Sequence, residues 1–104
     1  MKKGEIWWAI LPPPVGRRPV ILLSRNEAYA VRLAVTVAPL TTTIRNIPVE
    51  VPLGKKEGVP RKCVINCDDI LTIRKELLEG KITEISQEKM SALHQAIRFA
   101  MALP

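Results

Sequence analysis

Short apolar runs and alternating patterns of apolar and polar residues fill most of this chain, and both are typical of β-strands. Residues 4–11 alternate between two faces, formed by Ile6, Trp8 and Ile10 and by Glu5, Trp7 and Ala9. Because the face with Glu5 is the wetter one, we expect Trp8 to be the core tryptophan. Trp7 is expected to be covered by another element or a partner subunit, or to offer a stacking surface.

Six more strands are expected after this first one. Residues 19–24 begin at Pro19 and continue as an apolar run, the pattern of a strand buried on both faces. Residues 31–38 alternate, and Pro39 ends that strand or marks a bulge. Pro48 and Pro52 predict an edge strand at 49–53. The remaining predicted strands span residues 62–67, 70–73 and 81–85, and single helical turns are predicted near 25–30 and 75–78.

A helix is predicted at the C-terminus. Ser86 is a good N-cap, and apolar residues then recur at helical spacing, at Met90, Leu93, Ile97 and Met101. His94 borders this apolar stripe, so it is expected to be a packed or surface histidine and not a catalyst. Short strands followed by a closing helix predict a mainly β fold, a small antiparallel barrel with a helical cap, and residues 1–104 are expected to form a single domain.

The charge and the cysteines narrow the range of functions. The net charge is +6, which supports polyanion binding without establishing it. Cys63 and Cys67 have C-x₃-C spacing without partner histidines, so they are interpreted as small buried hydrophobic residues, and no metal or cofactor is expected. The chain has no run long enough to span a membrane and no signal peptide, so a cytoplasmic location is expected.

Candidate binding residues cluster in three places. Arg17 and Arg18 precede the predicted strand at 19–24, where an arginine is well placed to hold an anion. The second cluster is Thr41, Thr42, Thr43 and Arg45. It is interpreted either as hydroxyl donors that face a phosphate or as β-branched residues that fill a strand edge. A basic loop contains Lys55, Lys56, Arg61 and Lys62, and it either guides the backbone of a bound polyanion or is simply solvated.

Several segments in order resemble one family. The chain opens with Gly4-Glu5-Ile6-Trp7-Trp8, continues with Gly16-Arg17-Arg18-Pro19-Val20, and then has Val35-Thr36-Val37-Ala38-Pro39-Leu40-Thr41-Thr42. The stretches 61–66 and 69–73 and the closing helix follow in the expected order. Together they are similar to the MazF/PemK (Kid) family of toxin endoribonucleases.

The resemblance implies an SH3-like β-barrel with a C-terminal helix, usually a homodimer. It implies a toxin of a type II toxin–antitoxin system that cleaves single-stranded RNA, typically mRNA at short specific sequences, without a metal. In such cleavage the ribose 2′-OH attacks the adjacent phosphate, a group that DNA lacks. It also implies an antitoxin whose acidic, disordered tail neutralises the toxin.

The resemblance also implies site residues. The strand-two arginine of the family corresponds to Arg18, and the threonine after its "P-[LI]" pair corresponds to Thr41. The PemK branch uses an Arg-x-Asp pair, which here reads Asn66-Cys67-Asp68, so Asp68 remains a possible base. That branch's loop histidine is absent, which favours an Arg/Thr mechanism. Two alternatives stay open: a non-catalytic RNA- or protein-binding barrel, and a gyrase-directed toxin.

Overall fold

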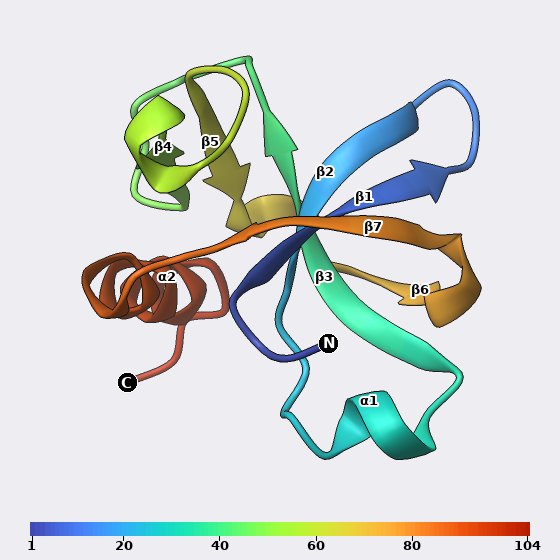
Figure 1. Cartoon of the computed structure of the whole chain (residues 1–104). Helices are drawn as coiled ribbons and strands as arrows, with labels where there is room; N and C mark the ends of the chain where they lie inside the picture. The colour runs from blue at the N-terminus through green and yellow to red at the C-terminus, as the bar shows by residue number, and fades with distance from the viewer.

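Seven antiparallel strands and a C-terminal helix make up the fold (Figure 1). The structure is a computed structural model and describes residues 1–104. The strands are β1 (Glu5–Leu11), β2 (Gly16–Leu22), β3 (Ala34–Thr41), β4 (Glu50–Leu53), β5 (Cys63–Asn66), β6 (Leu71–Arg74) and β7 (Leu78–Glu84). The α-helices are α1 (Ala28–Val31) and α2 (Gln87–Ala100), and three 3₁₀ turns are η1 (Lys55–Glu57), η2 (Cys67–Asp69) and η3 (Lys75–Leu77). Neither α-helix has the length and apolar character that crossing a bilayer requires.

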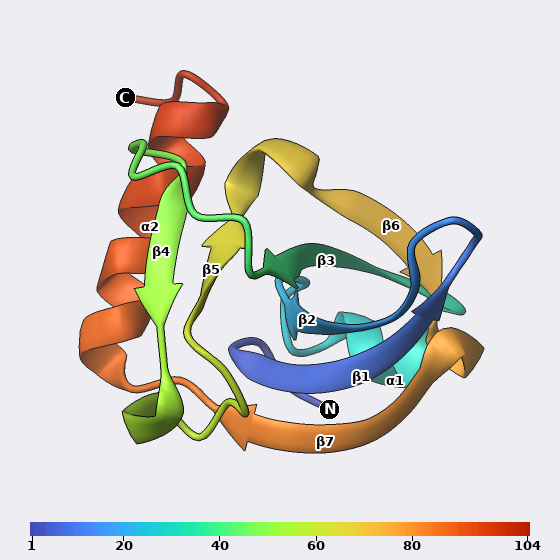
Figure 2. The same cartoon turned by 90° about the horizontal axis from the view of Figure 1, so that it is seen from above.

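The sheet is continuous and strongly curled. Its strand order is β4-β5-β3-β2-β1-β7, and β6 pairs with β3 beside this path. Because η3 joins β6 directly to β7, the sheet curls back on itself, and Figure 2 shows β7 and β6 bending around β1, β2 and β3. β4 is an edge strand, as its prolines predicted. The expected mainly β, antiparallel fold with a C-terminal helix is therefore confirmed.

Two hydrophobic clusters lie on opposite sides of the central strands. The larger one joins β4 and β5 to α2, which contributes Leu93 and Ala96. The smaller one fills the curled part of the sheet and includes Val20, Leu22 and Val37. Consecutive residues of β2 are buried in different clusters, which explains why its sequence is a continuous apolar run.

The predicted faces of β1 were wrong. Glu5 and Ala9 are 7% and 0% exposed, whereas Ile10 is 39% exposed and Trp8 is only half-buried. The reason is that both faces of β1 carry core residues. Glu5 tolerates burial because it accepts a hydrogen bond from Trp7 Nε1 at 2.9 Å and pairs with Lys81 at 3.3 Å. Burial acts to raise the pKa of Glu5, yet the hydrogen bonds from Trp7 and Lys81 leave that pKa below its ordinary value.

The third strand begins later than predicted. Val31 ends α1, and Val31 and Leu33 are each 76% exposed, so the alternation before Ala34 does not belong to a strand. The buried residues of α1 are Ala28 and Tyr29, and Tyr29 belongs to the smaller cluster. Pro39 does not end the strand, because β3 continues through it to Thr41.

The C-terminal helix begins as predicted. Ser86 Oγ accepts a hydrogen bond from the Lys89 backbone N–H, as an N-cap does. His94 is half-buried at the side of the helix, and burial lowers its pKa below the ordinary value. The expectation of a packed histidine is therefore confirmed. Cys63 and Cys67 are both free and buried, also as expected.

Candidate functional site

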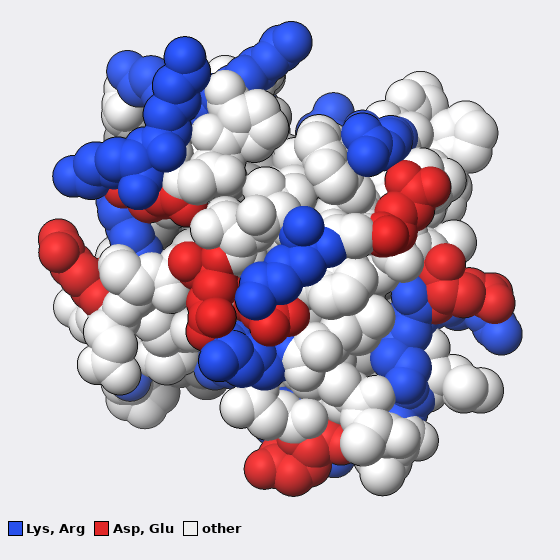
Figure 3. Space-filling view, viewed as in Figure 1, with Lys and Arg blue, Asp and Glu red and all other residues white.

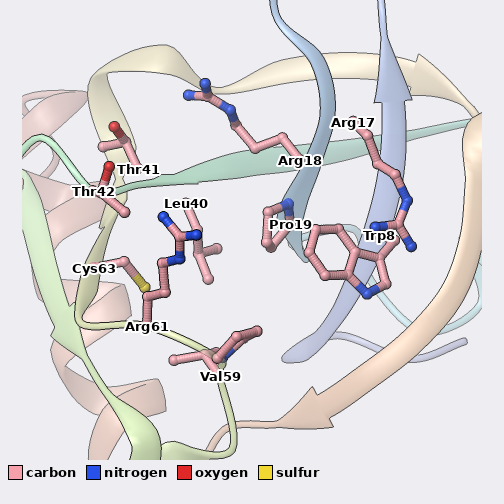
Figure 4. Close-up of a pocket in the computed structure, with 11 residues that line it drawn as sticks. Trp8, Arg17, Arg18, Pro19, Leu40, Thr41, Thr42, Val59, Arg61 and Cys63 are labelled. Atoms are coloured by element: carbon pink, nitrogen blue, oxygen red, sulfur yellow. The ribbon is translucent and has the colours of Figure 1, made fainter.

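A hollow of about 330 Å³ opens between β2, the end of β3 and the start of β5 (Figure 4). Three of the four arginines and two of the threonines proposed from the sequence meet there. The residues that line it are Trp8, Arg17, Arg18, Pro19, Leu40, Thr41, Thr42, Val59, Pro60, Arg61 and Cys63.

The hollow exists because β2 and β3 stop pairing at this point. Their last paired residues are Val20 and Pro39, and the next residues of β3 pair with β5 instead. Pro19 and Pro39 have no backbone N–H with which to continue the ladder between them. Extending the β2–β3 register past its end sets Arg18 opposite Thr41 across the gap.

Arg18 and Thr41 therefore face the same hollow. Both residues are half-buried and remain accessible to solvent. In Figure 4 the Arg18 guanidinium extends toward the side that holds Thr41 and Thr42. Thr41 Oγ1 accepts a hydrogen bond from the Thr43 N–H at 3.1 Å, which fixes the hydroxyl and leaves its proton available to a ligand. A guanidinium and an oriented hydroxyl of this kind form an oxyanion site.

Arg61 also enters this hollow. The loop between β4 and β5 carries it past Val59 and Pro60, and Figure 4 shows its guanidinium between Thr42 and Pro19. The sequence placed Arg61 with Lys55, Lys56 and Lys62 as one RNA-guiding group. The structure separates them, because none of these lysines lines the hollow. Figure 3 shows Lys and Arg side chains gathered over the β4–β5 segment.

Arg17 and Trp8 form the opposite wall. Although Arg17 and Arg18 were expected just before the strand, both lie within β2, where successive side chains point to opposite faces. Arg17 lies over the Trp8 ring, 4.0 Å from its centroid, and its Nε donates to Glu79 Oε1 at 3.1 Å. Trp8 was expected in the core, so its place beside the hollow was not predicted. The cross-strand pairing of Trp8 with Pro19 brings it here, and no local pattern indicates that pairing.

Asp68 does not join the site. It lies in η2, beyond the end of β5 that is opposite to Cys63, and its backbone N–H is bound by Asn66 Oδ1 at 3.0 Å. It is exposed and does not line the hollow. Cys63, at the start of β5, lines the hollow, whereas Asp68 lies beyond the other end of that strand. This position does not support the prediction that Asp68 is a base at the scissile phosphate.

Thr43 and Arg45 lie in the loop after β3 and do not line the hollow either. This loop is held by a buried carboxylate. Glu50, 9% exposed, accepts hydrogen bonds from the Arg45 and Asn46 backbone N–H groups at 3.0 and 2.9 Å. Glu50 thus stabilises the turn that follows Thr41.

The lining of the hollow is cationic and contains no carboxylate or imidazole that could accept a proton. Arg17, Arg18 and Arg61 supply three positive charges, and no carboxylate or imidazole lines the hollow. Burial raises the pKa of the Cys63 thiol above its ordinary value, so the thiol is neutral at physiological pH. No group of three His, Cys, Asp or Glu side chains is arranged to hold a metal. The site is suited to binding an anion.

Comparison with known proteins gives consistent matches over the whole chain. The family model described as "PemK-like, MazF-like toxin of type II toxin-antitoxin system" matches residues 2–101. The probable endoribonuclease MazF5 of Mycobacterium tuberculosis is 33% identical over 100 residues, covering 95% of this chain and 91% of the relative.

Solved structures agree with the sequence matches. The Mycobacterium tuberculosis toxin MazF-mt6 superposes with a TM-score of 0.89 at 34% identity, covering 96% of this chain and 98% of that one. An endoribonuclease in complex with its cognate antitoxin from Mycobacterial species has a TM-score of 0.89 at 26% identity, covering 100% and 97% of the two chains. The match of the family model to nearly every residue, together with these folds, shows that this chain belongs to the family of PemK-like, MazF-like toxins of type II toxin–antitoxin systems.

Proposed function

We propose that this chain is a toxin that cleaves single-stranded RNA, acting on mRNA in the cytoplasm. The observation that carries the proposal is the meeting of Arg18 and Thr41 in one solvent-accessible cationic hollow. Relatives over the full length of the chain have the name endoribonuclease, and they share the fold that creates the hollow. RNA provides both the anion that this hollow suits and a hydroxyl beside each phosphate.

The proposed reaction is an internal transesterification. The ribose 2′-oxygen attacks the adjacent phosphorus, the bond to the 5′-oxygen breaks, and the products end in a 2′,3′-cyclic phosphate and a 5′-hydroxyl. Negative charge builds on the phosphoryl oxygens as the new bond forms. Arg18 holds two of these oxygens with its planar fork, and the Thr41 hydroxyl donates a hydrogen bond to the same phosphate.

Arg61 and Thr42 have supporting roles in this proposal. Arg61 reaches the centre of the hollow from the β4–β5 loop and neutralises the phosphate next to the cleaved one. Thr42 adds a second hydroxyl beside Thr41. Because no carboxylate or imidazole lines the hollow, water takes the 2′-OH proton and water returns a proton to the departing 5′-oxygen. Stabilisation of charge then provides most of the acceleration.

The partners follow from the same site. An antitoxin with an acidic, disordered tail neutralises the toxin by placing carboxylates where the RNA phosphates bind. A similar fold has been solved with its cognate antitoxin, which supports this assignment. We propose that the toxin is a homodimer, and the exposed apolar side chains of Phe99, Met101 and Leu103 near the C-terminus are available for pairing.

The test is cleavage of a defined mRNA by the pure protein in EDTA. The expected result is fragments with 2′,3′-cyclic phosphate ends, with no cleavage of DNA of the same sequence. Binding of RNA without fragments would favour the non-catalytic barrel. Growth arrest with intact mRNA and inhibited DNA supercoiling would favour a gyrase-directed toxin.

A further inference from the structure

The hollow has two chemically different walls. Arg18, Thr41 and Thr42 occupy one side with charge and hydroxyls, and Trp8 occupies the other with the face of an indole ring (Figure 4). Trp8 is half-buried and is held across the β1–β2 ladder from Pro19. Since both walls belong to one hollow of about 330 Å³, a phosphate bound on the first side has room to place its nucleoside against the second.

The Trp8 ring already carries a planar group. The Arg17 guanidinium lies 4.0 Å from the ring centroid, a distance typical of stacking. Glu79 of β7 holds Arg17 there through a 3.1 Å bond between Glu79 Oε1 and Arg17 Nε. The guanidinium thus occupies the position that a flat aromatic ligand takes on an indole.

The Arg17 guanidinium is readily displaced from the Trp8 ring. The Arg17 and Glu79 side chains are 53% and 49% exposed, so water screens their ion pair. A nucleobase on an aromatic ring contributes roughly fivefold to 150-fold in affinity. A base can therefore replace the guanidinium, which then pairs with the phosphates of the bound strand.

We propose that the Trp8 ring is a nucleobase-binding subsite, where a base beside the cleaved phosphate stacks in place of Arg17. Glu79 keeps Arg17 on the ring while RNA is absent and therefore competes with the base. The inference rests on the proposed function in one respect, that single-stranded nucleic acid enters the hollow. Every base has an aromatic face, so the subsite positions the ribose and adds affinity irrespective of the base that occupies it.

The first test uses tryptophan fluorescence. The chain has two tryptophans, so Trp7→Phe leaves Trp8 as the only reporter. The probe is a pool of single-stranded oligodeoxynucleotides, which have bases and phosphates but no 2′-OH to be cut. The control is an abasic oligonucleotide of the same length. We expect quenching by the pool and none by the abasic strand. Equal quenching by both, or quenching by neither at concentrations where binding is measured by anisotropy, overturns the subsite.

The second test compares variants by anisotropy with the same pool. Trp8→Leu should weaken binding about fivefold to 150-fold, while Trp8→Phe keeps a stacking ring and stays within about threefold of the parent. Circular dichroism confirms that both variants are folded. Equal affinities of the Leu and Phe variants contradict stacking.

Glu79→Gln provides the third test, because it releases Arg17 from β7. We expect tighter binding, by about twofold to fivefold. The matched control is Glu76→Gln, which removes the carboxylate of a similar exposed pair, Arg74 Nε to Glu76 Oε1 at 2.8 Å, outside the hollow. If both variants tighten binding equally, the effect is one of net charge, and Glu79 does not control the access of a base to the Trp8 ring.

These tests separate the subsite from the nuclease. They measure binding of uncleavable strands, whereas the proposed function is measured by RNA fragments in EDTA. Base-dependent quenching without RNA cleavage retains the subsite and rejects the nuclease. Cleavage without base-dependent quenching retains the nuclease and rejects the subsite.

Discussion

Arg18 and Thr41 come from neighbouring strands that have stopped pairing, and in the proposed mechanism each has a task that a similar residue cannot perform. The guanidinium keeps its charge at every physiological pH and presents donors in a fork that matches two phosphate oxygens. The Thr41 hydroxyl is oriented by the Thr43 N–H, so its proton is directed away from the backbone. Preorganised donors of this kind stabilise developing charge without having to rearrange.

Removing either donor should therefore slow cleavage without unfolding the protein. We expect Arg18→Ala and Thr41→Val each to lower kcat by about 10² to 10³-fold. Both side chains are half-buried at the mouth of the hollow, so thermal unfolding should shift little. Arg25→Ala, an exposed arginine after β2, is the matched control and should keep its activity. Full activity of a folded Arg18→Ala protein would exclude Arg18 from the mechanism.

The absence of a protein base near the hollow predicts a characteristic pH profile. We expect log kcat/KM to rise steadily between about pH 5 and about pH 8, without the plateau produced by a carboxylate or imidazole base. Asp68→Asn should have the same rate and profile, because Asp68 lies in η2 outside the hollow. A large loss of activity in Asp68→Asn would restore the carboxylate as a base.

At the scale of elements, the β4–β5 loop decides where Arg61 lies. Gly58 has φ of +90°, a left-handed backbone conformation that glycine adopts freely. A Cβ at this position would lie 2.6 Å from Thr83 Oγ1 on β7. Thr83 Oγ1 in turn donates to the Glu57 carbonyl oxygen at 3.2 Å. The loop that positions Arg61 therefore packs closely against Thr83 of β7.

Gly58→Ala should break this contact. The cost of the backbone conformation and the clash together predict a loss of about 1–3 kcal/mol in the free energy of unfolding, measured by urea denaturation. RNA affinity should fall as well, because the loop no longer holds Arg61 in place. Gly80→Ala is the control, since no atom lies within 4 Å of its added Cβ. Equal stability of the two variants would show that the loop is not fastened there.

The elements also show what the sequence could predict. The helix after Ser86 and most strands follow from spacing and caps, which are local properties. The faces of β1 could not be predicted, because a curled sheet with a cluster on each side buries both. Arg18 and Thr41 were predicted from the order of the motifs, and both line the hollow. Trp8 was missed and Asp68 was placed wrongly because cross-strand register and strand length decide their positions.

At the scale of the whole molecule, charge is distributed unevenly. The net charge is +6, and Lys and Arg side chains gather over the β4–β5 segment beside the hollow (Figure 3). Lys55 and Lys56 belong to η1 in this segment. Basic side chains outside a binding site attract a polyanion from a distance and contribute to affinity through release of counterions. Their contribution should depend on salt and not on the chemistry of cleavage.

Reversing both charges in η1 tests this assignment. Lys55→Glu with Lys56→Glu should weaken RNA binding and reduce the slope of log K against log salt by about 1 to 2. Arg25→Glu with Arg32→Glu changes the net charge equally near α1, which Figure 1 shows on the opposite side of the molecule from β4. The α1 pair should leave the slope almost unchanged. Equal slopes for the two double variants would mean that the lysines of η1 do not contact the bound RNA.

The parting of β2 from β3 has a consequence for how such toxins diversify. The hollow is created by backbone that changes partners, with proline lacking the donor needed to close the gap. The hollow is lined by side chains, whereas the two ladders are held by backbone hydrogen bonds. A descendant can therefore exchange Trp8, Thr42 or Arg61 and change how a bound strand is held, while the scaffold beneath keeps its shape.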